Sequence, residues 1–207
     1  TSVPILGIFD FIGVFVFALS GALVAIQRKM DVFGIYVLAT VTACGGGVIR
    51  DVVMDNGIPA IFSSYTTIMI VIVASLLAIA TKSEKWSKLM LTADAIGLAV
   101  FAIDTGVRGL DNGYNLPQLV FASVITAVGG GVIRDILLQR VPIVLRKEVY
   151  ASAALAGAVV LWFIYPIMDK MVATYISLAV VFGIRMWSVY KHIDLPVVHL
   201  DTSESAQ

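Results

Sequence analysis

Long apolar segments separated by short polar joints occupy nearly the whole chain. A helix needs about 20 predominantly apolar residues to cross the hydrocarbon layer of a membrane. The pattern predicts seven such segments, near residues 4–26, 33–56, 65–81, 88–108, 116–139, 149–166 and 170–189. Of the 207 residues, 59% are hydrophobic and only 14% are charged, whereas a soluble domain carries roughly a quarter charged residues. The sequence therefore predicts an all-α integral membrane protein with seven transmembrane helices.

One seven-residue string, GGGVIRD, occurs twice within these segments. It covers residues Gly45 to Asp51 and, 84 positions later, Gly129 to Asp135, and the same shift places Asp10 on Asp94. Each copy contains three predicted spans, and an odd number of spans makes the second copy enter the membrane from the opposite side. We therefore expect two inverted three-helix repeats followed by a seventh helix outside the duplication.

The repeat divides the chain into four expected parts. Residues 1–86 form the first three-helix repeat, 87–167 the second, inverted repeat, 168–190 the seventh transmembrane helix and 191–207 a polar cytoplasmic tail.

Basic residues in the joints predict the orientation. Lys and Arg are enriched in cytoplasmic loops, and an outside N-terminus places nine of them inside and two outside. We therefore expect the N-terminus outside and the C-terminus in the cytoplasm. The inner residues are Arg28, Lys29, Lys82, Lys85, Lys88, Arg140, Arg146, Lys147 and Lys191, and the outer ones are Arg108 and Lys170.

The two glycine tracts predict interruptions of the second and fifth spans. Three consecutive glycines, at Gly45–Gly47 and Gly129–Gly131, weaken a helix, and carbonyl groups freed by a break must line a cavity or find a partner. Thr42 and Thr126 lie one turn earlier. Their hydroxyl groups either face the breaks or bond back to the carbonyl four residues before. Broken helices at corresponding places of inverted halves indicate a permeation site.

Charged residues inside the spans are costly in lipid and need partners. The rise of 1.5 Å per residue puts Asp10 and Arg50 at a similar depth in the outer half, and symmetry places Asp94 with Arg134 in the inner half. We therefore expect the pairs Asp10–Arg50 and Asp94–Arg134 to support the pore.

Three further aspartates have open roles. Adjacent helix positions diverge by about 100°, so each arginine of the motif should serve its neighbour poorly, which leaves Asp51 and Asp135 to face water or ions. Asp104 either lines the pore or pairs with Arg108 one turn later.

Several functional classes have no support in the sequence. The 14 basic and 14 acidic residues balance, so no nucleic-acid partner is indicated. No serine elbow, HExxH helix or Walker loop is present, so we expect no enzyme activity. No cofactor and no metal site are expected, and bound lipid is compatible with the composition.

Together these features resemble the prokaryotic branch of the trimeric intracellular cation (TRIC) channel family, the UPF0126-like proteins with a duplicated GGGxxRD motif. The resemblance spans residues 9–190 and rests on the paired strings, on Asp10 and Asp94 early in spans one and four, and on the three-plus-three-plus-one pattern. It implies a homotrimer in the inner membrane, with a pore in each protomer bounded by the kinked helices two and five. It also implies conduction of monovalent cations, chiefly potassium and also sodium.

Some bacterial relatives that share these motifs are similar to secondary transporters of a small amino acid such as glycine. A channel needs one wetted route with weak ion sites, whereas a carrier needs a pocket exposed alternately to each side. The sequence has charge-bearing glycine tracts at two depths and no evident pocket for both ends of an amino acid. This favours the channel and leaves the carrier as the alternative.

Overall fold

The computed structural model describes residues 4–54, 57–81, 86–146 and 149–191, and all regular secondary structure in these residues is helical. The helices are α1 (Pro4–Gln27), α2 (Val32–Val53), α3 (Ala60–Ser63), α4 (Tyr65–Ala80), α5 (Trp86–Asp111), α6 (Leu116–Leu137), α7 (Ile143–Arg146), α8 (Ala151–Ile164) and α9 (Lys170–Lys191).

The seven longer helices lie where the hydrophobic pattern placed the seven spans, and the bounds agree to within three residues. Five of them, α1, α2, α5, α6 and α9, are long and apolar enough to cross a membrane. The apolar helices α4 and α8 have 16 and 14 residues and are shorter than the usual span. The predicted tail lies outside the described residues, except for Lys191 at the end of α9.

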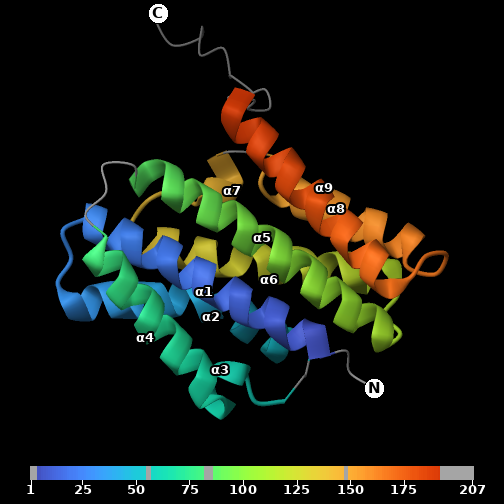
Figure 1. Cartoon of the computed structure of the whole chain (residues 1–207), viewed down its shortest axis with the longest axis horizontal. Coiled ribbons are helices and arrows are strands. Elements are labelled where there is room, and N and C mark those ends of the chain that lie inside the picture. Colours follow the sequence, from blue (N-terminus) through green and yellow to red (C-terminus); the bar gives the residue numbers. More distant parts are fainter. Residues whose placement is uncertain (1–3, 55–56, 82–85, 147–148, 192–207) are drawn as a thin grey trace, which may run out of the picture.

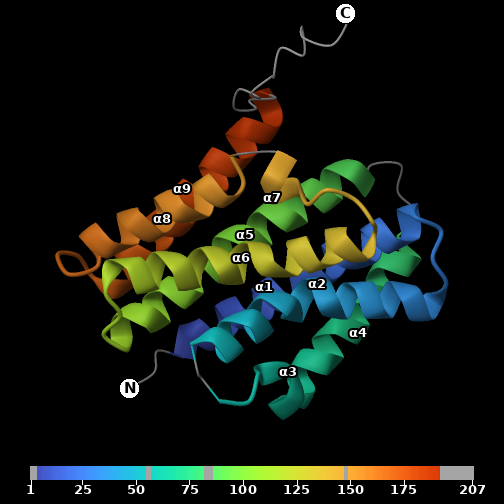
Figure 2. The same ribbon diagram turned by 180° about the vertical axis from the view of Figure 1, so that it is seen from behind.

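Four helices form the centre of the molecule (Figures 1 and 2). Helices α1 and α2 pack against each other, as do α5 and α6, and the two pairs meet through α1 with α5 and α2 with α6. Helix α4 covers the first pair and α8 covers the second, and each follows a one-turn helix, α3 or α7. Helix α9 packs mainly on α5 and α8, at the side of the second pair, and also contacts α1 through the rings of Tyr175 and Phe9.

The two halves repeat each other down to their turns. The turns after α1 and α5 contain a residue with positive φ, Lys29 at 56° and Gly113 at 75°, which is the left-handed residue of a Schellman helix end. The next helices then begin at the caps Asp31 and Asn115, whose side chains accept a backbone N–H of the first turn. Each pair of residues is 84 positions apart, so the duplication includes the connections as well as the helices.

Contacts between the halves are reciprocal. A Cβ atom added to Gly13 would lie 2.9 Å from the Phe101 ring, and one added to Gly97 would lie 2.5 Å from the Phe17 ring. Such exchange of equivalent contacts is the mark of a two-fold axis. Gly13 of α1 meets Phe101 of α5, and the later Phe17 of α1 meets the earlier Gly97 of α5. The two helices are therefore antiparallel, as Figure 1 shows. The second half is therefore inverted relative to the first.

The predicted breaks in the second and fifth long helices are wrong. Helices α2 and α6 run without interruption through their glycine tracts. The glycines instead permit backbone contact where α2 crosses α6: a Cβ on Gly46 would lie 2.0 Å from the carbonyl oxygen of Thr126, and one on Gly130 would lie 2.0 Å from that of Thr42. Small residues at helix interfaces allow this approach in membranes, and an intact helix leaves no backbone group unpaired in lipid.

Replacing Gly46 by alanine should destabilise the fold. The new methyl group would meet a backbone carbonyl that cannot move aside, and overpacking of this kind costs about 1–3 kcal/mol. Gly47→Ala is the matched control, because the nearest atom to its new Cβ is the Arg50 Nη2 at 3.9 Å, and alanine is favoured in helices by up to about 1 kcal/mol. Thermal unfolding in detergent checks this. Equal midpoints for the two variants would contradict the crossing described here.

Candidate functional site

Two clusters of charged and polar residues lie at equivalent places of the two halves. The first-half cluster comprises Asp10, Arg50, Asp51, Asp104 and Arg108, and the second-half cluster comprises Ser20, Asp94, Arg134, Asp135 and Arg140. The arginine-aspartate pair of each cluster comes one turn after the glycine tract. The crossing of α2 and α6 therefore fixes where both clusters stand.

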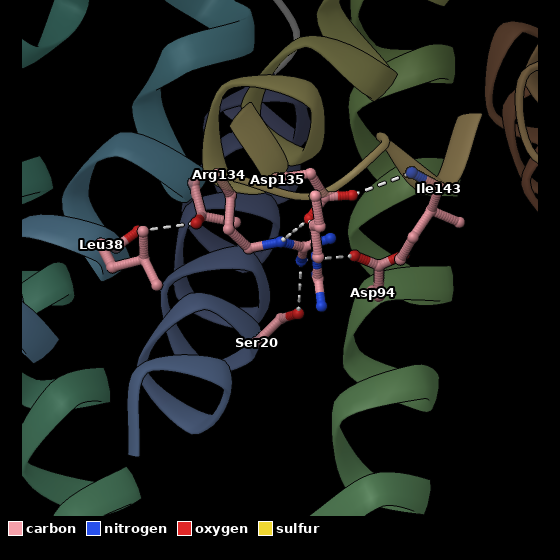
Figure 3. A network of polar contacts seen from close by, with 8 residues as sticks. Ser20, Leu38, Asp94, Arg134, Asp135 and Ile143 are labelled. Carbon is pink, nitrogen blue, oxygen red and sulfur yellow. Dashed lines mark hydrogen bonds and ion pairs between the residues drawn. The ribbon is translucent and has the colours of Figure 1, made fainter. Parts of the chain in front are cut away.

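Arg134 is the centre of the second-half cluster (Figure 3). Only 2% of its surface is exposed. Its Nη1 donates to Asp94 Oδ1 at 3.1 Å and to Ser20 Oγ at 3.3 Å, and its Nε donates to Asp135 Oδ1 at 3.0 Å. The predicted pair Asp94–Arg134 is confirmed. One guanidinium group thus joins α1, α5 and α6, which suits a buried arginine whose charge must be fully compensated.

Asp135 does not face water or ions, contrary to expectation. Its Oδ1 accepts hydrogen bonds from Arg134 and from Arg140 Nε and Nη2, and its Oδ2 accepts the backbone N–H of Ile143 at 2.9 Å. The chain after α6 folds back over the carboxylate, so that α7 begins at one of its donors. Asp135 is 1% exposed and held from three positions of the chain.

Arg50 also pairs with the aspartate next to it. Its Nε lies 2.8 Å from Asp51 Oδ1, so the expectation that adjacent residues serve each other poorly is wrong in both halves. The long arginine side chain turns back along its own helix far enough to meet the neighbouring carboxylate. Asp10 lines the same cavity as Arg50, but of the ion pairs between described residues none joins these two. The predicted pair Asp10–Arg50 is therefore not formed in this structure.

A cavity of about 370 Å³, part of it continuous with solvent, opens beside the first-half cluster. The equivalent space of the second half is smaller, about 150 Å³, and is also partly continuous with solvent. A local difference accompanies the difference in size: Ile143 donates its N–H to Asp135, whereas the equivalent residue of the first half is Pro59, which has no N–H to give. Asp51 lines the larger cavity, although it is only 6% exposed and is paired with Arg50, whereas Asp135 is covered by the backbone of Ile143. Both cavities are lined by polar and apolar residues, namely Asp10, Cys44, Gly47, Arg50, Asp51 and Pro59 in the first, and Gly131, Arg134, Asp135, Ile143 and Tyr150 in the second.

The remaining predicted residues take the more local of their two roles. Asp104 Oδ2 accepts from Arg108 Nε at 2.8 Å, which is the expected pair one turn apart. The hydroxyl groups of Thr42 and Thr126 donate to the carbonyl oxygens of Leu38 and Ala122, four residues earlier, at 2.6 and 2.7 Å. Their backbone oxygens, not their hydroxyl groups, contact the glycines of the opposite helix.

Sequence reasoning missed three contributors to these clusters. Ser20 binds Arg134, and Arg140 had been counted only as an orientation charge. Arg185 of α9 is 1% exposed, with its guanidinium carbon 4.7 Å from the centre of the Tyr150 ring. A lone arginine within a predicted span is a signal in itself, and it could have identified Arg185. A serine in an apolar helix gives no such signal.

The chain is similar to proteins of known family and fold. A family model described as "Glycine transporter" matches residues 7–83 and 91–166. The UPF0126 inner membrane protein YadS of Escherichia coli (strain K12) is 38% identical over 200 residues, which cover 93% of this chain and 95% of YadS.

Two solved structures share the fold over nearly the full length. A chain from work on the structural basis for conductance through TRIC cation channels gives a TM-score of 0.84 at 33% identity, covering 95% of this chain and 98% of that one. The TRIC trimeric intracellular cation channel orthologue from Rhodobacter sphaeroides gives 0.85 at 28% identity, covering 92% and 100%.

The Asp94–Arg134 pair should show strong coupling in a double-mutant cycle. Arg134→Ala strands buried carboxylates and should cost about 3–5 kcal/mol of stability, while adding Asp94→Asn should recover part of this, with a coupling of about 0.5–3 kcal/mol. The control pair is Asp111–Lys170, whose side chains are 36% and 55% exposed, and whose coupling should stay below about 1 kcal/mol. Unfolding in detergent measures both cycles. Additive effects at Asp94 and Arg134 would refute the pairing.

Proposed function

Because the chain belongs to the UPF0126 family, the prokaryotic membrane proteins with the TRIC channel fold, we propose that it is a channel for monovalent cations, potassium and also sodium. Two of the solved structures with this fold are described as TRIC cation channels. The observation that carries the proposal is the acidic cavity against α1, α2 and α5, whose equivalent in the inverted half is present but narrow.

In this proposal each protomer has its own pore beside the crossing of α2 and α6. The two cavities reach these helices at Gly47 and Gly131, immediately after the crossing glycines Gly46 and Gly130. A route from one cavity to the other passes the buried Arg134 and the half-buried Arg50. A bare arginine would repel a permeant cation, and Asp51, Asp94 and Asp135 neutralise these charges in the structure.

The narrow second cavity makes this conformation closed at that end. Conduction requires the space around Asp135 to widen. Arg140 and the backbone N–H of Ile143 bind Asp135 there and fill the space that is open next to Asp51.

The proposed assembly is a homotrimer in membrane lipid, following the trimeric channels with the same fold. Seven transmembrane helices are proposed, with α4 and α8 as the shorter third helix of each repeat. The N-terminus is outside, the C-terminus is in the cytoplasm, and the location is the inner membrane, as described for YadS.

Reporter fusions test the orientation. The basic residues of the joints predict that a fluorescent protein fused after residue 207 will fluoresce, because it folds in the cytoplasm, and that alkaline phosphatase at the same position will be inactive. Alkaline phosphatase in the joint between α5 and α6, at Gly113, should be active. The reverse pattern would invert the proposed topology.

A carrier for a small amino acid such as glycine is the second candidate. A cavity that is open in one half and covered in the inverted half is also what one state of an alternating-access transporter would present. The matching family model is described as a glycine transporter.

Recording in planar bilayers separates the two functions. Purified protein in a potassium chloride gradient should give unitary current steps that reverse near the potassium equilibrium potential, because the neutralised arginines do not exclude cations. Bilayers treated with detergent alone are the control. Silent bilayers together with saturable glycine uptake into liposomes would instead establish the carrier.

A further inference from the structure

We propose that the first-half cavity is a binding site for one singly charged cationic group, with Asp10, Asp51 and Asp104 supplying its negative field. The group is either an alkali cation or the ammonium end of a small molecule. This inference rests on the proposed function, because it names the half in which a permeant cation resides.

The argument begins with a substitution between the two halves. The shift of 84 positions places Ser20 on Asp104. Ser20 of α1 is uncharged, and its Oγ accepts a hydrogen bond from Arg134 of the other half. By the same symmetry Asp104 of α5 faces the Arg50 side, and its charge interacts with those of both Asp10 and Arg50. The equivalent position is therefore neutral in one cluster and a carboxylate in the other.

The charges of the two clusters consequently differ. The first-half cluster has the carboxylates of Asp10, Asp51 and Asp104 against the guanidinium groups of Arg50 and Arg108, a surplus of one negative charge. The second-half cluster has two carboxylates and two guanidinium groups, and a third guanidinium, that of Arg185, lies next to it against Tyr150, so this side has no negative surplus. The surplus accompanies the larger cavity, where a cation has room to enter.

Oxygen atoms for such a group line the cavity on Asp10 and Asp51. Asp104 is not one of the lining residues, so it contributes its charge rather than a ligand atom; it is 1% exposed, and its Oδ1 has no hydrogen-bond partner among the described residues. A buried acceptor without a partner is costly. Asp51 lacks the backbone donor that Asp135 receives, since Pro59 stands at the equivalent position.

A surplus of one charge selects a monovalent group. Hard divalent cations require several converging oxygen ligands, and the described residues contain no group of three or more His, Cys, Asp or Glu side chains able to hold a metal ion. Two arginines beside the carboxylates further oppose a divalent cation.

Cys44 provides a direct probe of this cavity. It is the only cysteine of the chain and lines the cavity with Asp10 and Asp51. Its reaction rate with the cationic reagent 2-aminoethyl methanethiosulfonate is compared with that of the neutral methyl methanethiosulfonate, each divided by the rate with a free thiol. The acidic field should make the normalised cationic rate about 10-fold higher, since charged clefts concentrate counter-ions. Potassium should slow the cationic reaction relative to N-methylglucamine at equal ionic strength.

The two halves supply a matched control. Val128 is the residue equivalent to Cys44 and lines the second cavity, so Val128→Cys on a Cys44→Ser background places the same thiol beside the cluster that has no negative surplus. It should show no cationic preference. Asp104→Asn should lower the preference at Cys44 several-fold, and Asp10→Asn, which removes no ion pair found in the structure, should do so if the first variant fails to fold.

The outcomes divide clearly. Equal normalised rates of the cationic and the neutral reagent at Cys44 would overturn the cation site. They would not decide whether the protein is a channel, which the bilayer recordings test separately. Protection by glycine where potassium gives none would assign the site to an ammonium group, and protection by potassium would assign it to an alkali cation. If Cys44 does not react with either reagent, thermal unfolding decides: stabilisation by potassium chloride over N-methylglucamine chloride, lost in Asp104→Asn, is required, and its absence refutes the inference.

Discussion

The contact between the backbones of α2 and α6 is the constraint on which the rest of the molecule depends. Gly46 meets the carbonyl of Thr126 and Gly130 meets that of Thr42, so the two helices touch at a distance that no side chain would permit. This contact lies on the two-fold axis and fixes both halves at once. Because Arg50 and Arg134 each follow the crossing by four residues, their positions on either side of it are set by the glycines rather than by their own ion pairs.

The same scaffold carries two different electrostatic environments. In the second half, Arg134 and Arg140 enclose Asp135 and the backbone of Ile143 completes the enclosure. In the first half, a proline replaces the backbone donor and an aspartate replaces Ser20, which leaves a cavity with excess negative charge. The proposed cation site therefore lies where the two halves differ, since a perfectly symmetric molecule would have no preferred end.

The hydrophobic periodicity and the internal repeat predicted most of the fold. Much of what they did not predict depends on how far individual side chains extend. The long helices, their inverted order and the Asp94–Arg134 pair followed from apolar length, an odd span count and depth along the helix. The broken helices did not follow, because a glycine triplet weakens a helix and also permits close packing, and only the neighbouring helix decides between them. The pairing of Arg50 with Asp51 was missed because directions on a helix wheel ignore how far an arginine side chain extends.

The reciprocal pairing of Gly13 with Phe101 and of Gly97 with Phe17 has an evolutionary consequence. A face that recognises its own inverted copy needs no second gene: a single ancestral three-helix unit, inserted in both directions, would have met itself through this very surface. Fusion of two such units would give each a fixed direction in the membrane, and the two sequences would then be free to diverge. From then on a serine and an aspartate could occupy equivalent positions of the two halves, and α9 could pack mainly against one half.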